Sequence, residues 1–393
     1  MTFIMNCPVC DNAQTKPFLS RHHVPVHQNM VFEERESAVD MIRGELTLFL
    51  CDQCGFVYNA SFDDSKLNYS AMYNNIQDYS STFHQYTDEL VERILKNLPN
   101  PASTIVEVGC GKGRFLHKLF VRNQALKGYG FDPSYEGDES QCDGRLVFIK
   151  DFYGPQYEHI QADVIICRHV IEHIQQPVEL LTTIREALRN SPNARVYFET
   201  PCLEWILRNT VVWDFFYEHC SYFSIPSLTF SFQRAGYKVD SYEHVFLGQY
   251  LWFEAVVDGT WPGEQQIVDS STVLALAEQY LMKENEKKGR WATALEHALA
   301  DGAVAVWGAG AKGVTFANLF DPLNEKITCY VDVNPSKQGR FLPGSGHSIL
   351  HYQSLRTKKI RHVILMNPNY REEVEGLVEE HQLCSKLVDL TDE

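Results

Sequence analysis

The sequence predicts an α/β protein whose main domain is a doubly wound parallel sheet, with a small metal-binding domain before it and a Rossmann-like domain after it. Two CxxC pairs occupy the N-terminal part, short apolar runs alternate with helical segments in the middle, and a second strand–glycine–helix unit follows residue 300. Alternating strands and helices favour a parallel sheet. Domains of about 100–200 residues divide a chain of 393 residues into two or three, and we expect them at 1–66, 67–240 and 241–393.

The overall composition argues against large anionic partners. The formal net charge is −16, so the surface repels polyanions, and we expect neither nucleic acid nor an anionic membrane as a partner. No run approaches the roughly 18–20 apolar residues that span a bilayer, and the N-terminus has no secretory signal. We therefore expect a cytoplasmic protein whose 11 cysteines are mainly reduced thiols or metal ligands.

The N-terminal part contains two pairs of cysteines with the spacing of a zinc site, Cys7 with Cys10 and Cys51 with Cys54. Each CxxC turn directs two thiolates toward one point, so two turns supply the four soft ligands of tetrahedral zinc. Because all four positions are thiolates, we expect a structural zinc ion, and the long intervening loop should form strands of its own. Four unrelated thiols or a redox dithiol are the alternatives. The histidines of this loop are expected to be surface or core residues: His22, His23 and His27.

The middle part contains the strands and helices of the predicted sheet in a regular order. The predicted strands are 104–108, 126–131, 163–167 and 195–198, and a segment with helical spacing, 114–122, lies between the first two. The first run is β-branched and ends in glycines, which is typical of a buried parallel strand that leads into a ligand-binding turn.

The turn after the first predicted strand has the composition of a cofactor-binding loop. Glu107 is followed by Gly109 and Gly111, and glycines let a ligand approach the backbone closely. The next strand ends at Asp132, about where a carboxylate meets the two hydroxyls of a ribose. Further on, residues 151–152 combine a carboxylate with an aromatic ring, which could frame adenine. An NAD site is the alternative, but the spacing is GxGxG rather than GxGxxG and an acid precedes the first glycine.

An aromatic segment after the last predicted strand, 215–224, carries the residues best suited to proton transfer. Glu218 and His219 are adjacent in it, and Tyr222 follows. Histidine suits proton transfer because its pKa lies near neutrality. The alternative is that the segment is an edge of the core, with a histidine whose hydrogen bonds are made inside the protein and which has no catalytic role. The position just after the strand at 195–198, where such a sheet opens toward its substrate, favours a catalytic segment.

The C-terminal part repeats the strand–glycine–helix pattern. A helical stretch is expected at 272–299, with the charged run 283–290 as a solvated face, and a strand is expected at 303–307. The following run, 308–313, matches GxGxxG, and Asp332 follows the next predicted strand. Taken alone, this pattern indicates a second dinucleotide site, and the helix N-terminus at 310–312 could attract a diphosphate.

The glycine turn of the middle part resembles the fingerprint of class I S-adenosylmethionine-dependent methyltransferases. Glu107 before the GxGxG turn, Asp132 at the end of the next strand and the segment 168–174 carry the resemblance. It implies S-adenosylmethionine as the cofactor, with Glu107 near its methionine end and Asp132 on its ribose. The cofactor-binding residues are then expected to be Glu107, Gly109, Gly111, Asp132, Asp151, Phe152 and Tyr79, the last from an aromatic region that also holds Tyr69, Tyr73 and Phe83.

The whole chain resembles the sugar C-methyltransferases that build branched-chain deoxysugars. The four-cysteine domain, the methyltransferase core, the C-terminal Rossmann-like domain and the run Glu218-His219-x-x-Tyr222-Phe223-Ser224 carry this resemblance. It implies that a nucleoside-diphosphate 4-keto-6-deoxyhexose is methylated at C3 through an enolate. His219 is then the expected base, with Glu218, Tyr222 and His173 as further catalytic residues, and the C-terminal domain would close over the substrate and hold its nucleotide.

The chain departs from that family at two positions that bear on the substrate. Phe216 stands where family members often carry a tyrosine, and Glu172 stands where the sugar enzymes tend to have a non-acidic residue before the histidine. Methylation of oxygen, nitrogen or carbon on another small metabolite is therefore the alternative function, and a non-catalytic zinc-plus-Rossmann scaffold is a third. The sequence predicts neither the base of the nucleotide, nor the stereochemistry of methylation, nor the oligomeric state.

Overall fold

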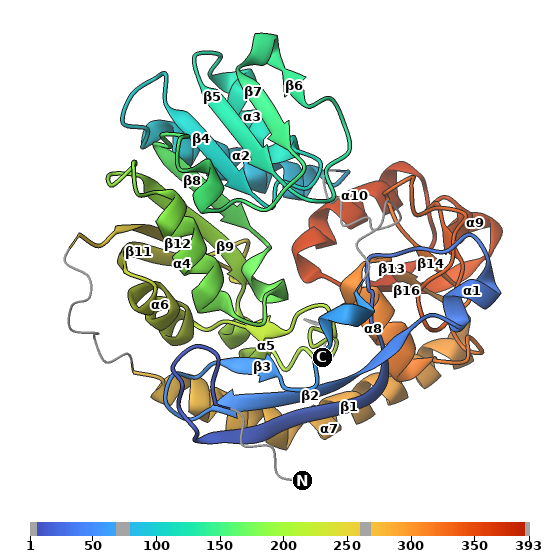
Figure 1. Ribbon diagram of the computed structural model, residues 1–393. Helices are drawn as coiled ribbons and strands as arrows, with labels where there is room; N and C mark the ends of the chain where they lie inside the picture. Colours follow the sequence, from blue (N-terminus) through green and yellow to red (C-terminus); the bar gives the residue numbers. More distant parts are fainter. Residues whose placement is uncertain (1–5, 68–78, 260–268, 390–393) are drawn as a thin grey trace.

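A computed structural model describes residues 6–67, 79–259 and 269–389; Tyr69 and Tyr73 lie outside the described residues. Three sheets make up this part of the chain, with four, eight and five strands. The large sheet and the C-terminal sheet lie on either side of the molecule, and the N-terminal sheet lies with the long helix α7 below both (Figure 1).

The N-terminal sheet has the order β1–β2–β3–β10, and all its neighbours pair antiparallel. Its strands are β1 (Thr15–Pro25), β2 (Arg43–Cys51), β3 (Val57–Asn59) and β10 (Ser221–Tyr222), and α1 (Arg35–Val39) and a 3-10 turn (Asp64–Lys66) accompany them. Strands β1 and β2 lie largely within the loop between the two cysteine pairs, as predicted. Strand β10 comes from the aromatic segment, so the N-terminal sheet holds the chain directly after His219.

The large sheet has the order β11–β12–β9–β8–β4–β5–β7–β6. Strands β9 to β7 pair parallel, and antiparallel strands close the two edges. The bounds are β4 (Thr104–Val108), β5 (Lys127–Phe131), β6 (Ser140–Gln141), β7 (Leu146–Ile149), β8 (Val164–Arg168), β9 (Arg195–Pro201), β11 (Tyr237–Val245) and β12 (Tyr250–Val257). This is a doubly wound, mainly parallel sheet, as the sequence predicts.

Helices cover both faces of the large sheet because successive strand residues point to opposite sides. Ile105 and Val164 pack with α2 (Ser81–Lys96) and α3 (Arg114–Arg122), whereas Val106 and Ile165 pack with α4 (Pro177–Ala187) and α6 (Ile225–Arg234). Helix α5 (Leu203–Arg208) follows β9. The predicted helix 114–122 coincides with α3. The carboxyl ends of β4, β5, β8 and β9 therefore meet at one edge of the sheet, where parallel doubly wound sheets bind ligands.

The large sheet continues past residue 240, the position expected for a domain boundary. Strand β11 crosses this position, and β12 pairs with β9 along seven residues, from Tyr250 opposite Pro201 to Val256 opposite Arg195. The ladder hydrogen bonds of β12 are therefore made within the large sheet, and the linker to the C-terminal part follows β12.

The C-terminal sheet is entirely parallel, with the order β15–β14–β13–β16–β17. Its elements are α7 (Ser271–Asp301), β13 (Ala303–Trp307), α8 (Ala311–Phe320), β14 (Cys329–Val331), β15 (Ile349–Leu350), α9 (Ser354–Thr357), β16 (Ile360–Leu365), α10 (Arg371–Glu380) and β17 (Lys386–Val388). The predicted strand at 303–307 is β13, and the predicted helix at 272–299 is α7. This arrangement is the Rossmann-like domain expected from the sequence.

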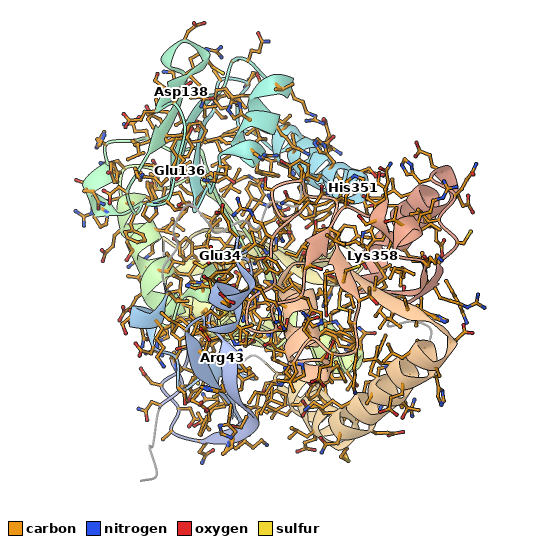
Figure 2. The ribbon with its side chains drawn as sticks, turned by 90° about the vertical axis from the view of Figure 1, so that its right-hand side faces the viewer. Glu34, Arg43, Glu136, Asp138, His351 and Lys358 are labelled. Carbon is orange, nitrogen blue, oxygen red and sulfur yellow. The ribbon has the colours of Figure 1, made fainter. Side chains whose placement is uncertain are left out.

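The N-terminal sheet joins the other two parts through polar contacts. Arg43, labelled in Figure 2, donates to the carbonyl of Gly344 at 2.9 Å. Arg21 in β1 donates to the carbonyl of Phe215 at 3.0 Å and forms a buried ion pair with Glu284 of α7 at 3.1 Å. The N-terminal domain therefore acts as a bridge that holds the segment before His219 against α7.

Candidate active site

A cavity of about 270 Å³ lies between the large sheet and the C-terminal domain. Both parts supply its walls. The large-sheet side includes Tyr79, His169, Glu172, His173, Asp214, Phe216, His219 and Gln249, and the C-terminal side includes Gly308, Lys312, Asp332, Lys337, Asn367 and Tyr370. The cavity therefore lies at the carboxyl edges of both sheets, and it brings His173 and His219 together as predicted.

Among the histidines that line the cavity, His219 has the fewest polar contacts with described residues. No hydrogen bond of its ring to another described residue is found, and its neighbours are the rings of Phe216, at 4.2 Å between centroids, and His173, at 4.9 Å. Burial lowers the pKa of His219 well below its ordinary value, and the charges of His173, His169 and Lys312 lower it further. The ring is therefore neutral at pH 7 and carries a basic lone pair.

His173 has a defined tautomer. Its Nδ1 lies 3.0 Å from the backbone carbonyl of Glu218, and a carbonyl can only accept, so Nδ1 carries the proton. In the neutral ring the lone pair then lies on Nε2. The two rings stand almost perpendicular, with an interplanar angle of 88°. The pair therefore combines one oriented imidazole with one that has no hydrogen-bond partner among the described residues.

Glu218 and Tyr222 hold the loop around His219 and do not line the cavity. The Glu218 carboxylate is fully buried and accepts from Nδ1 of His27 at 3.2 Å and from the N–H of Gln28 at 3.0 Å. The Tyr222 hydroxyl donates to the carbonyl of Phe216 and accepts from its N–H, both at 2.9 Å. The Glu218 carboxylate therefore points to the residues just after β1 and not to the neighbouring His219 ring.

His27 is buried, which agrees with the expectation of a surface or core residue, but the sequence did not indicate the contacts that His27 and His169 make. His27 is buried and contacts Glu218 across 191 positions of the chain, a separation for which the sequence carries no local signal. His169 lines the cavity between two carboxylates, with Nδ1 3.3 Å from Glu172 and Nε2 3.3 Å from Glu199. Burial opposes its charge, but the two carboxylates outweigh burial and raise the pKa of His169 to about 9.

The backbone at His169 is strained. Its φ of 54° lies in the left-handed region, which costs a non-glycine residue of order 1–3 kcal/mol and occurs mainly at functional sites. Glu199 beneath it is fully buried and accepts from the Tyr86 hydroxyl and from Nε of Arg168, both at 2.5 Å. This buried network of ion pairs and hydrogen bonds holds the strained turn at the end of β8.

The glycine turn after β4 requires glycine at each position. Gly109, Gly111 and Gly113 have φ values of 70°, 53° and 71°. A Cβ on Gly109 would lie 2.2 Å from Val170, whereas a Cβ on Gly111 would meet nothing within 4 Å. Gly111 therefore faces open space, as a residue does where a ligand approaches the backbone. Asp132, the acid predicted at the end of the next strand, contacts this turn, because its carboxylate accepts a hydrogen bond from the N–H of Gly111 at 2.8 Å.

The Glu107 side chain beside this turn has a buried oxygen without a hydrogen-bond partner. It is buried, its Oε2 has no hydrogen-bond partner, and burial raises its pKa to about 8 against the opposing charge of Arg168. An unpaired buried carboxylate oxygen costs free energy unless a donor or cation reaches it. The positively charged methionine end of S-adenosylmethionine is such a group, so the residues of this turn fit the predicted cofactor.

The remaining predicted cofactor residues lie at the surface. Phe152 exposes 71 % of its surface, which leaves its ring available for stacking. Asp151 accepts from the N–H of Phe152 at 2.8 Å and from the Tyr157 hydroxyl at 2.7 Å, and the Tyr157 bond lowers the pKa of Asp151. Tyr79 lines the cavity, and the guanidinium of Arg114 lies 5.8 Å from its ring centroid.

Two family models match the chain, and together they decide its chemistry. Residues 80–242 match a methyltransferase domain, and residues 271–384 match a C-methyltransferase C-terminal domain. The C-methyltransferase NovU of Streptomyces niveus is 22 % identical over 94 % of this chain and 91 % of that protein.

The chain is an S-adenosylmethionine-dependent methyltransferase.

Other similarities of the methyltransferase cover smaller shares of the chain. The 2-ketoarginine methyltransferase of Streptomyces arginensis is 29 % identical over 27 % of this chain and 34 % of that protein. The solved structure of the Burkholderia thailandensis 1,6-didemethyltoxoflavin-N1-methyltransferase is 14 % identical, with a TM-score of 0.34 over 46 % of this chain and 79 % of that chain. The resemblance to the C-methyltransferases thus rests on the C-terminal family model and on NovU, which extends over nearly the whole chain.

The C-terminal domain of the methyltransferase contains a turn whose hydrogen bonds are similar to those of the glycine turn after β4. The N–H of Gly308 donates to the Val331 carbonyl at 2.9 Å, as that of Gly109 does to Phe131 at 2.8 Å. Asp332 accepts the N–H of Ala309 at 2.8 Å, as Asp132 accepts that of Gly111. This second turn faces the cavity.

Two lysines stand beside the second turn. Lys312 pairs with Asp214, and the buried Lys337 donates to the Ala309 carbonyl at 3.1 Å. Burial lowers the pKa of Lys337. Two amines and the N-terminus of α8 therefore face the same region of the cavity, which favours an anionic group there.

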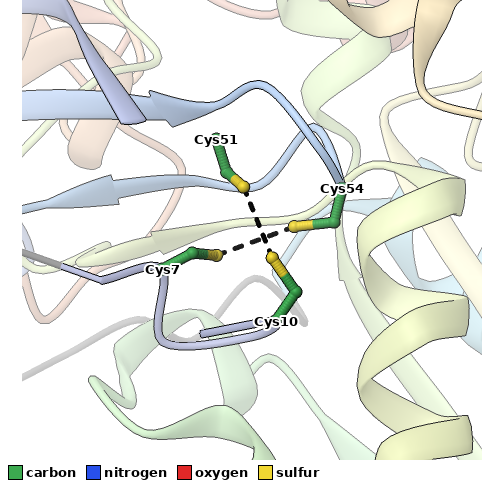
Figure 3. A group of neighbouring side chains, drawn as sticks. All are labelled: Cys7, Cys10, Cys51 and Cys54. Atoms are coloured by element: carbon green, nitrogen blue, oxygen red, sulfur yellow. Dashed lines mark hydrogen bonds between the residues drawn. The ribbon is translucent and has the colours of Figure 1, made fainter. Parts of the chain in front are cut away.

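The four predicted zinc ligands of the methyltransferase meet at one point (Figure 3). The Sγ atoms of Cys7 and Cys54 lie 3.6 Å apart and those of Cys10 and Cys51 lie 3.4 Å apart, and all four lie within 4.8 Å of one another. The cysteines come from two turns, as predicted, and no histidine of the intervening loop joins them. Four converging thiols without an acceptor other than each other fit a tetrahedral soft cation.

Across 6–67, 79–259 and 269–389, no helix combines the length and the apolar character needed to span a bilayer.

Proposed function

We propose that this methyltransferase transfers a methyl group to carbon, at C3 of a nucleoside-diphosphate 4-keto-6-deoxyhexose. The observation that carries the proposal is the neutral His219 without a hydrogen-bond partner among the described residues, in a cavity whose opposite wall holds two lysines and a helix N-terminus. A base on one side and an anion-binding turn on the other suit a substrate that has an acidic C–H at one end and a diphosphate at the other.

The proposed chemistry needs one proton acceptor. S-adenosylmethionine supplies an electrophilic methyl group. Nε2 or Nδ1 of His219 would take the proton from C3, and the adjacent ketone would hold the electron pair as an enolate. The new C3–methyl bond would form as the sulfur–methyl bond of the cofactor breaks, with S-adenosylhomocysteine as the leaving group. His173, whose Nδ1 is held by the Glu218 carbonyl, lies beside the base, and the lone pair on its Nε2 suits a proton relay. Cavity walls from two domains orient the substrate and exclude water, which is the main contribution that the protein makes.

In this proposal each turn binds a different ligand: the turn after β4 binds the cofactor, and the turn of the C-terminal domain binds part of the substrate. Glu107, Gly111 and Asp132 hold the cofactor, with Asp151, Phe152 and Tyr79 around its adenine side. The turn of the C-terminal domain, with Asp332, holds the nucleotide of the substrate. The hydrogen bonds shared by the two turns support this division.

The four cysteines bind a structural zinc ion in this proposal. Thiols at 3.4 and 3.6 Å need little rearrangement to become a tetrahedral thiolate set with Zn–S distances of about 2.3 Å. Such a site has no open position, so it supplies folding free energy and not chemistry.

The decisive experiment is a mass-spectrometric screen of thymidine- and guanosine-linked 4-keto-6-deoxyhexoses with S-adenosylmethionine. We expect one methyl group on carbon and exchange of the C3 hydrogen with deuterated solvent when the cofactor is replaced by S-adenosylhomocysteine. The exchange should disappear in His219→Ala and persist in His297→Ala, which changes an exposed histidine of α7. A product that carries an O-methyl or N-methyl group would replace the proposal with the alternative chemistry, with His219 deprotonating a heteroatom.

A further inference from the structure

We propose that Glu172, His173 and His219 form a binding site for a divalent transition-metal ion inside the substrate cavity. One ligand atom from each residue lies within 4.8 Å of those of the other two, and all three residues line the cavity. This site is distinct from the four-cysteine cluster, which lies on the N-terminal sheet. The metal ion would be a ligand of the cavity in addition to the substrate, and its binding does not depend on which substrate the enzyme uses.

Two of the three side chains, those of His173 and Glu172, are oriented by contacts behind them. Nδ1 of His173 donates to the Glu218 carbonyl, so its lone pair is on Nε2. Glu172 accepts from the Thr200 hydroxyl at 3.2 Å and lies 3.3 Å from Nδ1 of His169. Hydrogen bonds of this kind, from a ligand's far side to a carbonyl or hydroxyl, are the usual support of metal-binding histidines and carboxylates. His219 contributes a ring that makes no hydrogen bond to another described residue.

The donor set selects the class of ion. Two imidazoles and one carboxylate suit zinc, cobalt and nickel, whereas magnesium and calcium prefer oxygen ligands alone. Three protein ligands leave coordination positions open toward the cavity, unlike the closed set of four cysteines. The Glu172 carboxylate supplies negative charge for the ion, which is needed because the cavity also holds the cationic His169 and Lys312. Without Glu172 these two cations would repel a divalent ion. His169 is itself paired with Glu199, and Lys312 is paired with Asp214.

The other three-residue cluster of the described chain is a weaker candidate. Cys202, Glu204 and His244 also lie within 4.8 Å of one another. There the Cys202 thiol donates to Glu204 at 3.4 Å, and Glu204 accepts the first N–H of α6, from Ile225, at 2.8 Å. These groups already satisfy each other and a helix end, so they serve as the comparison in the test.

Occupation of the proposed site has a defined consequence for the proposed chemistry. The metal ion and the C3 proton compete for the same lone pair of His219, so a bound ion removes the base. The ion also fills space next to His173. We therefore expect zinc or cobalt to inhibit methyl transfer competitively with the keto sugar, and substrate to protect against the inhibition.

Metal binding can be tested without substrate. Protein whose four-cysteine site is loaded with zinc is titrated with Co²⁺ alone. We expect one further equivalent to bind, with visible d–d bands and without the thiolate charge-transfer band that cysteine ligands produce. His219→Ala should abolish this equivalent, Glu172→Gln should weaken it at least about tenfold, and His244→Ala should leave it unchanged.

Three results would overturn the inference. Protein that takes up no Co²⁺ beyond the four-cysteine site would exclude it. A charge-transfer band that disappears in His244→Ala would move the ion to the cluster with Cys202. Stimulation of methyl transfer by Co²⁺ would contradict the inhibitory consequence. Because binding is measured without substrate, failure of the proposed methylation leaves this test intact.

Discussion

Ionisable side chains around the cavity have opposite pKa shifts although they lie close together. Burial and neighbouring positive charges keep His219 neutral, whereas two carboxylates outweigh burial and keep the nearby His169 charged, with a pKa of about 9. A neutral and a charged imidazole therefore occur in one cavity because their partners differ. Environments that separate pKa values in this way assign the base and the electrostatic support in many enzymes.

The proposed role of His219 as a base predicts the size of the effect of its removal. His219→Ala should lower kcat by about 10²–10⁴, the usual contribution of a general base. S-adenosylmethionine affinity should change little, because the cofactor turn lies on other residues. Single-turnover rates and calorimetry on the same variant check both statements. Equal losses in turnover and in cofactor affinity would indicate a structural role instead.

The raised pKa of Glu107 predicts that a proton is released when the cofactor binds. With a pKa of about 8 in the free protein, the carboxyl is mostly protonated at pH 7, and a cation next to it lowers that pKa. The bound state then holds fewer protons, so S-adenosylmethionine affinity should rise with pH from 6 to 8 and level off above about 8. Calorimetry at pH 7 in buffers of different ionisation enthalpy should detect the released proton.

Glu107→Gln provides the control for this linkage. The amide cannot ionise, so the variant should bind more weakly and with no proton release near pH 7. A wild-type protein whose affinity is flat between pH 6 and 8 would show that Glu107 does not meet the positive end of the cofactor.

Among the elements, the short strand β10 connects the two cysteine turns to the loop that carries His219. Ser221 and Tyr222 pair with Tyr58 and Val57 of β3, and the Asn59 N–H donates to the Cys220 carbonyl at 2.9 Å. Strand β3 begins three residues after Cys54. The position of His219 therefore depends on strands that the cysteine turns hold together.

Loss of the proposed zinc ion should affect folding before chemistry. Cys51→Ser removes one ligand, and structural zinc sites couple their binding free energy to folding. We expect a lower unfolding midpoint and lower expression, about one zinc per chain in wild-type protein, and a smaller effect on the rate of the chemical step in the molecules that fold. Metal analysis and thermal unfolding measure these quantities. Cys142→Ser, at an exposed free cysteine, is the matched control, and well-folded wild-type protein without zinc would refute the site.

On the scale of the whole molecule, polar contacts join the two walls of the cavity. Glu373 of α10 accepts from the Ser80 hydroxyl at 2.6 Å and from the Thr82 N–H at 3.0 Å, at the N-terminus of α2. The buried amides of Gln249 and Asn367 bond to each other across the same boundary. A carboxylate at a helix N-terminus is electrostatically favourable, so these contacts favour a closed cavity.

Removal of the Glu373 contact should therefore weaken substrate binding more than it slows chemistry. Glu373→Ala loses two charge-assisted hydrogen bonds, and we expect kcat/KM for the proposed sugar-nucleotide substrate to fall by up to about tenfold, the equivalent of about 1.4 kcal/mol. The fall should come mainly from KM. Steady-state kinetics with Glu380→Ala, an exposed acid at the end of the same helix, as control test this, and an unchanged KM would argue against closure through α10.

The sequence by itself determined the three-part organisation, the four converging cysteines and the glycine turn with Asp132, because each depends on spacings of a few residues or on the periodicity of one element. Only the tertiary structure decided which partners the catalytic loop has. His27 meets Glu218, β10 joins the N-terminal sheet, and His169 is held in a left-handed conformation by Glu172 and Glu199. These contacts join positions up to 191 residues apart, and chain packing, which no local pattern encodes, brings them together.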